Sequence, residues 1–145
     1  MNVLNAEKEL RTDIQNLPLL YDFIESFLSK VDAITQGHPP QDLNYEIQLA
    51  IEEWYVNIVK HGFRGESHGH VHVQLHYEDG WITIRIIDDG PAFDPHTIPS
   101  IEKSNDPQQV KIGGLGFHLI RNVMNSTSYD REAGKNILTM MKKYE

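Results

Sequence analysis

The sequence contains no cysteine, which excludes disulfide bonds, thiol nucleophiles and thiolate metal ligands. It has no apolar run near the roughly 18 residues of a membrane helix, and its N-terminus lacks the profile of a signal peptide. Clustered basic residues are also missing, because 13 Lys and Arg stand against 21 Asp and Glu, a net charge of −8. These absences argue against a membrane or direct nucleic-acid partner, and we expect a cytoplasmic protein.

The composition is that of one globular domain. The chain has 145 residues, of which 39% are hydrophobic and 23% charged. It shows neither internal repeats nor low-complexity tracts. We therefore expect a single domain over residues 1–145.

The spacing of apolar residues predicts an α+β fold. Apolar residues recur at three- and four-residue steps after Pro18 and again from Leu43 to about Gly62, which indicates two helices. The period then changes to two on either side of Asp79-Gly80, which predicts a β-hairpin. The other expected elements are a strand within 2–12, a helix of about ten residues after the glycines at 113–116, and a hairpin turning at Ala133-Gly134.

Two polar residues of the second predicted helix lie one turn apart. Glu53 and Asn57 share a helix face because they are four residues apart. An exposed polar stripe is the ordinary explanation for such a pair. The alternative is that Asn57 binds magnesium through its amide oxygen, that Glu53 activates a nucleophile, and that Lys60 reaches a phosphate.

The segment IIDDGPAFDP ends a buried-looking strand with a carboxylate and a glycine. Gly90 lets the backbone bend close to whatever Asp88 contacts. An ordinary turn would use the same residue types. The functional alternative is a carboxylate that accepts a hydrogen bond from an exocyclic amine, such as that of adenine, with the ring between apolar side chains.

The segment KIGGLGFHLI places three glycines ahead of a predicted helix. It is not a P-loop, because Phe117 rather than Lys follows Gly116, and the glycine spacing does not match the dinucleotide-binding motif. Backbone N–H groups of such a stretch can converge on an anion at the helix N-terminus, although a glycine-rich loop without a ligand is equally compatible. The long polar, proline-containing segment before it is typical of a lid or a disordered loop.

These three segments, in this order, resemble the GHKL (Bergerat-fold) ATP-binding superfamily. EEWYVNIVKHGF, DDGPAFDP, GGLGFHLIRNVMNSTSY and GKNILTMMKK are most similar to the anti-sigma factor serine/threonine kinases, and the resemblance covers about residues 15 to 143. It implies a two-layer α/β sandwich with a mixed, mostly antiparallel sheet covered on one face by helices. It also implies an ATP lid at about 98–112.

The resemblance further implies a role for individual residues. Glu53 would be the general base, Asn57 the magnesium ligand and Asp88 the carboxylate that selects adenine. The residues implied to bind the nucleotide are Asn57, Lys60, Asp88, Gly90, Phe93, Lys111, Gly113, Gly114, Leu115, Gly116, Phe117 and Thr139, and Arg121 is a further candidate for phosphate. Ala92 departs from the pattern, since many relatives have a second glycine there.

The function implied by the resemblance is that of an ATP- and Mg²⁺-dependent serine/threonine protein kinase. Its substrate would be a small anti-sigma-factor antagonist, its second partner a sigma factor or analogous regulator, and its assembly a homodimer. The alternative is a nucleotide-gated protein-binding module of the same fold without significant kinase activity.

A row of histidines, His68, His70, His72 and His76, is expected on one side of a strand. Imidazoles so arranged can bind zinc, but no cysteine or carboxylate in the row completes a familiar ligand set. The simpler explanation is the solvated face of a strand whose other face is apolar.

Overall fold

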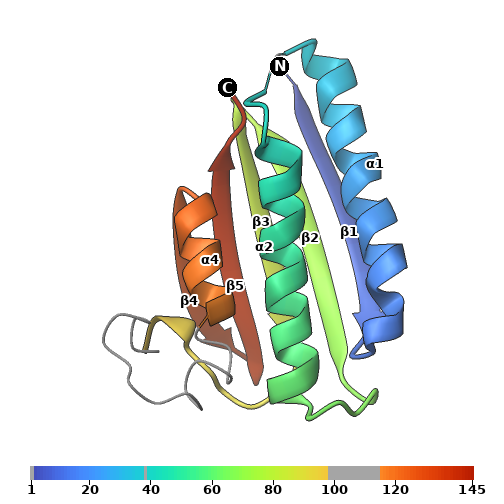
Figure 1. The fold of residues 1–145 in the computed structure, drawn as a ribbon, viewed down its shortest axis with the longest axis vertical. Helices are drawn as coiled ribbons and strands as arrows, with labels where there is room; N and C mark the ends of the chain where they lie inside the picture. The colour runs from blue at the N-terminus through green and yellow to red at the C-terminus, as the bar shows by residue number, and fades with distance from the viewer. Residues whose placement is uncertain (1, 38, 98–114) are drawn as a thin grey trace.

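The computed structural model describes residues 2–37, 39–97 and 115–145. The described residues form a five-stranded sheet with α-helices on one of its faces (Figure 1). The elements are β1 (Val3–Arg11), α1 (Leu17–Thr35), α2 (Leu43–Asn57), β2 (His70–Glu78), β3 (Trp81–Asp88), α4 (Leu115–Val123), β4 (Ser126–Glu132) and β5 (Lys135–Lys143). The α+β fold and the two-layer arrangement are thereby confirmed.

The strands follow the order β1-β2-β3-β5-β4, and each of the four pairings is antiparallel. The expected mixed sheet is therefore wrong for the described strands. Two helices connect β1 to β2. The chain reverses its direction at each of the three connections, so β2 runs antiparallel to β1. Both predicted hairpin turns are confirmed, and left-handed backbone at Gly80 (φ 82°) and Gly134 (φ 76°) matches the twist of the flanking strands.

The core lies between the sheet and the helices. Val71, Val73 and Leu75 of β2 are buried against the helices, and α1 contributes Ile24 and Val31 from its predicted apolar stripe. Figure 1 shows α2 between α1 and α4, so α2 is the central element of the helical layer. The last residues of α2 and of β3 lie at the same end of the molecule, where both line one cavity.

The second helix reaches Gly62 as expected, but its last turn is wider than an α-helix. A π-helical turn spans Ile58–Gly62, and the Phe63 N–H donates to the carbonyl of Ile58, five residues earlier, at 3.0 Å. π-turns of this kind change which side chains stack on one face. This widening decides which residue lies one turn beyond Asn57.

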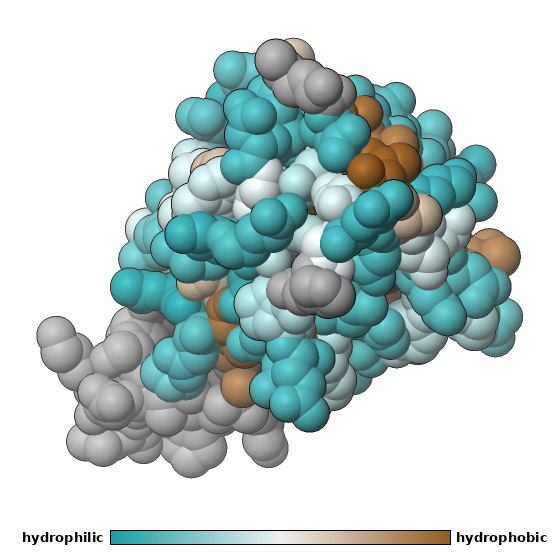
Figure 2. All heavy atoms as spheres, turned by 90° about the horizontal axis from the view of Figure 1, so that it is seen from above, coloured by the Kyte–Doolittle hydropathy of each residue, from teal (hydrophilic) through white to brown (hydrophobic). Residues whose placement is uncertain are grey.

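The surface seen from above is mostly hydrophilic, with apolar side chains in small separate groups (Figure 2). Scattered apolar residues are normal on a protein surface. Among the described residues, no helix combines the length and the apolar character required to cross a membrane.

Replacing Tyr55 with Phe tests how α2 is anchored to the end of β1. The Tyr55 side chain is buried, and its hydroxyl lies 2.6 Å from the Arg11 carbonyl oxygen and 2.8 Å from that of Asp13. The substitution leaves these acceptors without their donor, so we expect chemical denaturation to show a loss of about 1–3 kcal/mol. Tyr45→Phe on the same helix is the control, since Tyr45 is 69% exposed, and should change stability by less than about 0.5 kcal/mol.

Candidate functional site

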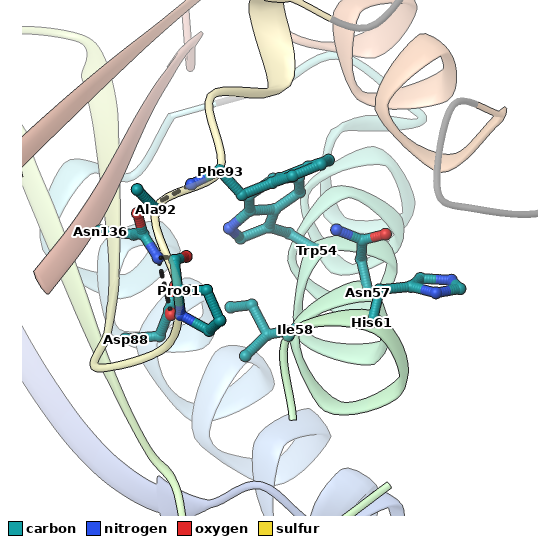
Figure 3. A pocket seen from close by; sticks show the side chains of 10 residues that line it. Trp54, Asn57, Ile58, His61, Asp88, Pro91, Ala92, Phe93 and Asn136 are labelled. Atoms are coloured by element: carbon teal, nitrogen blue, oxygen red, sulfur yellow. Dashed lines mark hydrogen bonds between the residues drawn. The ribbon is translucent and has the colours of Figure 1, made fainter. Parts of the chain in front are cut away.

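A cavity opens between the end of α2, the end of β3, the start of β5 and the loop that follows Asp88 (Figure 3). Its walls are mainly apolar, with a few polar side chains from different elements. The lining residues are Trp54, Asn57, Ile58, His61, Gly62, Asp88, Pro91, Ala92, Phe93 and Asn136. An apolar cavity with few convergent polar groups is the usual form of a small-molecule site.

Asp88 is a carboxylate held in this apolar setting. It is only 4% exposed, and its Oδ1 accepts hydrogen bonds from the Gly90 N–H at 2.9 Å and from Asn136 Nδ2 at 3.1 Å. Its Oδ2 has no hydrogen-bond partner among the described residues. Burial raises the pKa of Asp88 above its ordinary value of 3.8, although the hydrogen bonds from Asn136 and Gly90 act to lower it.

Gly90 matters because the backbone passes directly under Asp88. A Cβ added at Gly90 would lie 2.9 Å from the Asp88 Oδ1 and 3.2 Å from the Phe63 ring. Any larger residue would displace the carboxylate or the ring. The glycine therefore maintains the position of Asp88 and does not line the cavity itself.

Asn136 connects Asp88 to the loop above the cavity. Its Nδ2 donates to Asp88 and, at 2.8 Å, to the Pro91 carbonyl, while its Oδ1 accepts from the Phe93 N–H at 3.3 Å and from the Tyr129 hydroxyl. Asn136 is 4% exposed, and both its Nδ2 and its Oδ1 make hydrogen bonds. It therefore fixes the carboxylate and the loop in one arrangement.

Asn57 presents a different kind of polar group to the cavity. It is 9% exposed, and its Oδ1 is buried without a hydrogen-bond partner among the described residues. Buried carbonyl oxygens are rarely left in this condition. An amide oxygen with free lone pairs is a suitable ligand for a hard cation such as magnesium.

Glu53 lies one helical turn before Asn57, as the spacing predicts. It is half-buried, lies outside the cavity lining, and has no hydrogen-bond or ion-pair partner within the part of the chain that the structure describes. The neighbouring Glu52 differs, because its carboxylate accepts a 2.7 Å hydrogen bond from the Tyr21 hydroxyl.

The structure does not bring Lys60 to the cavity. Lys60 is exposed on the π-helical turn, and His61 lines the cavity instead. The wider turn rotates the third residue after Asn57 away from its face and leaves the fourth beneath it. The structure therefore places His61, and not Lys60, in the cavity lining, and a contact between Lys60 and a phosphate stays a prediction.

Thr139 and Phe117 are also placed differently from expectation. Thr139 pairs with Arg85, and alternation along β5 turns it to the sheet face away from the helices, whereas Asn136 pairs with Asp88 and faces the cavity. Phe117 is 3% exposed and packs on Trp54 with ring centroids 5.9 Å apart, so it belongs to the core behind the cavity. Phe93 does line the cavity, as implied.

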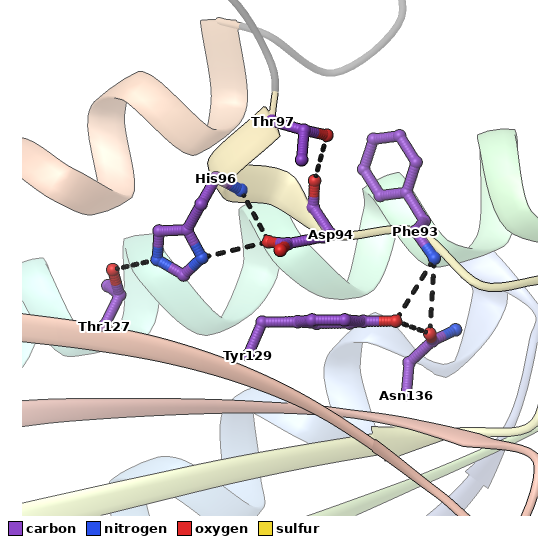
Figure 4. A network of polar contacts seen from close by, with 7 residues as sticks. All are labelled: Phe93, Asp94, His96, Thr97, Thr127, Tyr129 and Asn136. Carbon is purple, nitrogen blue, oxygen red and sulfur yellow. Dashed lines mark hydrogen bonds and ion pairs between the residues drawn. The ribbon is translucent and has the colours of Figure 1, made fainter.

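A polar network holds the segment just after the cavity loop (Figure 4). His96 contacts Asp94 Oδ1 through Nδ1 at 3.0 Å and Thr127 Oγ1 through Nε2 at 2.9 Å. The Thr97 hydroxyl donates to the Asp94 carbonyl at 2.7 Å. These contacts attach the residues that precede position 98 to β4.

Several expected residues lie outside the described part of the chain. These are the implied lid at about 98–112 together with Lys111, Gly113 and Gly114. Leu115 and Gly116 are the first residues of α4, and Arg121 is exposed later on the same helix.

The histidine row is only partly as expected. His70, His72 and His76 alternate on the solvated face of β2, but His68 precedes the strand and packs edge-on against Phe63 at 5.4 Å. Each strand histidine contacts a different side chain: His70 contacts Asp89, His72 contacts Glu7 and His76 contacts Asn5. Within the described residues, no group of three or more His, Cys, Asp or Glu could hold a metal ion.

Asn136, Trp54 and His61 are among the cavity residues that the sequence interpretation did not name as site residues. Asn136 could have been found, because Asn136, Leu138 and Met140 alternate and so place a polar side chain on the apolar face of β5. Trp54 could also have been noticed, since it shares a helix face with Asn57 and Ile58.

Comparison with known proteins shows a family and a shared fold. The sequence pattern of the family described as Histidine kinase-like ATPase domain matches residues 15–142. A crystal structure of the RsbU and RsbW domains of a Mycobacterium tuberculosis protein superposes on 97% of this chain and 32% of that chain, with a TM-score of 0.66 at 16% identity, which shows the shared fold.

Curated relatives narrow the family. Serine/threonine-protein kinase BtrW of Bordetella bronchiseptica is 33% identical over 100 residues, 68% of this chain and 69% of that protein. Serine-protein kinase RsbW of Listeria innocua is 32% identical over 103 residues, 68% of this chain, and the match spans only 64% of that relative's length. The chain belongs to the histidine kinase-like ATPase domain family, within the GHKL anti-sigma factor kinase group.

Neighbouring aspartates Asp88 and Asp89 should have opposite effects on stability. Burial raises the pKa of Asp88, so its ionisation costs stability as pH rises through the folded-state pKa. Asp88→Asn retains an oxygen for Gly90 and Asn136, and we expect a higher free energy of unfolding than wild type at pH 7. This difference should vanish below the ordinary pKa of 3.8, where the carboxyl is protonated in both states.

Asp89 provides the matched comparison. Partial burial raises its pKa, but hydrogen bonds from the His70 backbone and ring outweigh this and lower it below 3.8. Its stabilisation is present above the unfolded-state pKa and is lost as pH falls through the folded-state pKa. Asp89→Asn should therefore lower the free energy of unfolding at pH 7. Urea titrations in which both variants change this free energy in the same direction would contradict the assignment.

Proposed function

We propose that the chain is an ATP-binding serine/threonine protein kinase of the anti-sigma factor type. Its substrate would be a small anti-sigma-factor antagonist, and a sigma factor or analogous regulator its second partner. The observation that carries the proposal is the buried Asp88–Asn136 pair in the same cavity as Asn57, whose oxygen is unpartnered among the described residues, with Glu53 one turn away. Family membership and relatives named as serine or serine/threonine kinases support it.

The cavity suits an adenine ring. Apolar side chains of Ile58, Pro91 and Phe93 offer contact to its faces, and Asp88 offers a carboxylate oxygen to its exocyclic amine. Guanine carries a carbonyl oxygen at the corresponding carbon, which would meet the carboxylate acceptor-to-acceptor. The site should therefore prefer ATP to GTP.

Asn57 is the residue that would hold Mg²⁺, together with phosphate oxygens of the nucleotide. Its buried and unpartnered Oδ1 fits this role, since magnesium accepts carbonyl oxygens beside phosphate. The bound ion would supply neutralisation of phosphate charge.

Glu53 would act on the protein substrate. Its carboxylate orients the Ser or Thr hydroxyl and accepts its proton as the hydroxyl oxygen bonds to the γ-phosphorus. The bond from the γ-phosphorus to the β,γ-bridging oxygen breaks, and ADP leaves with that electron pair. Most of the rate would come from positioning, which the rigid α2 helix provides.

Partners and assembly extend the proposal. A relative named Anti-sigma F factor from a Geobacillus species is 27% identical over 116 residues, 77% of this chain and 76% of that protein, which supports a sigma factor as binding partner. We also expect a homodimer, as the resemblance to the anti-sigma factor kinases implies, and light scattering would measure its mass.

Thermal unfolding with nucleotides tests the binding site. With Mg-ATP at 100 times its Kd, binding stabilises by about 2.7 kcal/mol, which should raise the melting temperature by roughly 5–10 °C. GTP should give no comparable shift. Asp88→Asn should abolish the ATP shift, because an amide N–H₂ would then face the amine of adenine.

Glu53→Gln tests the chemical step. We expect Mg-ATP binding within about twofold of wild type, and transfer from labelled ATP to an antagonist candidate reduced roughly 10²–10⁴-fold. Glu52→Gln is the control, because the Glu52 carboxylate is engaged by Tyr21 and should not be needed. If Glu53→Gln transfers phosphate as fast as the wild type, Glu53 has no part in the mechanism. If the wild type binds ATP but transfers no phosphate, the result favours a nucleotide-gated binding module.

A further inference from the structure

Trp54 carries a buried hydrogen-bond donor at the wall of the cavity. Its side chain is 3% exposed, and its indole Nε1–H has no acceptor among the described residues. Across the described part of the chain, only Trp54 Nε1 and Asn57 Oδ1 are buried side-chain polar atoms in this condition, and both residues line the same cavity. The two orphaned atoms therefore mark one place in the molecule.

An unpartnered indole N–H requires an explanation, because buried Trp side chains usually find an acceptor. Packing alone does not provide one, since Phe could fill much of the same apolar space without a polar atom. A ligand that brings an acceptor into the cavity would satisfy the donor. Asn57 already has such an explanation in the proposed metal role, and Trp54 does not.

The orientation of the indole is constrained on two sides. Phe93 stacks on it with ring centroids 6.3 Å apart and planes 30° apart, and Phe117 packs against it edge-on at 5.9 Å. Figure 3 shows the indole nitrogen turned toward the side of the cavity that holds Asp88, Pro91 and Asn136. The donor thus points to the region where Asp88 would engage a base.

We propose that Trp54 is a base-specificity residue whose Nε1–H donates to a ring nitrogen of adenine next to the exocyclic amine. This inference rests on the proposed ATP-binding function. Adenine presents an amine donor flanked by the acceptor nitrogens N1 and N7, so an acceptor-only carboxylate beside a donor-only indole complements it. In guanine, O6 replaces the amine and N1 carries a proton, so this pair of protein groups matches adenine better.

The test measures Mg-nucleotide Kd values by calorimetry for wild type and Trp54→Phe with ATP, 1-deaza-ATP and 7-deaza-ATP. Each analogue lacks one of the two candidate acceptor nitrogens. We expect Trp54→Phe to weaken ATP binding about 5- to 20-fold. We also expect one analogue to bind wild type correspondingly less tightly and to show no further loss with the variant, which is the non-additivity of a direct contact.

Trp81→Phe is the matched control. Trp81 is the only other tryptophan in the sequence and begins β3 at the opposite end of that strand from Asp88, so its replacement should leave all three Kd values unchanged. A variant with benzothienylalanine at position 54 keeps the bicyclic shape and lacks the N–H. It should reproduce the loss seen with Trp54→Phe even if Phe loosens the packing.

Two results would overturn the inference. One is unchanged ATP binding by the benzothienylalanine variant, and the other is an equal loss for ATP and both analogues. Failure of the proposed function is distinguishable, because the folded wild type would then not bind Mg-ATP at all. If wild type binds ATP and Asp88→Asn does not, a neutral result at position 54 counts against the Trp54 contact alone.

Discussion

The hydrogen bond from the Asn136 side chain to Asp88 is the interaction on which the candidate site depends. The two residues face each other in the β3–β5 pairing, and both lie on the sheet face that the helices cover. A buried carboxylate is costly unless its lone pairs are used. Asn136 and the Gly90 N–H both donate to Oδ1, and the Asn136 amide also holds the Pro91 carbonyl and the Phe93 N–H, so it fixes the carboxylate and the adjoining loop.

The central helix brings the other groups to this carboxylate. Trp54 and Asn57 lie on one side of α2, and the π-helical turn after Asn57 adds His61 to the cavity. A single rigid element therefore sets the distances between the apolar wall and the amide oxygen. Glu53 lies outside the cavity lining, one turn before Asn57 on the same helix.

Among the described residues, two buried side-chain polar atoms, Trp54 Nε1 and Asn57 Oδ1, have no hydrogen-bond partner. Native proteins tolerate few such atoms, and these two belong to residues of one cavity. Their desolvation lowers the stability of the free protein, and the ligand acceptor and the cation that we propose would recover it. The site is thus organised before binding, at a cost offset elsewhere by the apolar core beneath the sheet.

The sequence by itself determined the helices, the hairpins and the buried face of each strand, because periodicity and turn chemistry are local. It also placed Asn57 and Asp88, which line the cavity, and Glu53 one turn from Asn57, since helical spacing and the end of a strand set their positions. Only the tertiary structure decided that Asn136 rather than Thr139 faces the cavity, because this depends on how β5 aligns with β3. The all-antiparallel pairing and the widened turn at the end of α2 were likewise set by packing, since local propensity does not report which strands meet or where a helix must adjust to its neighbours.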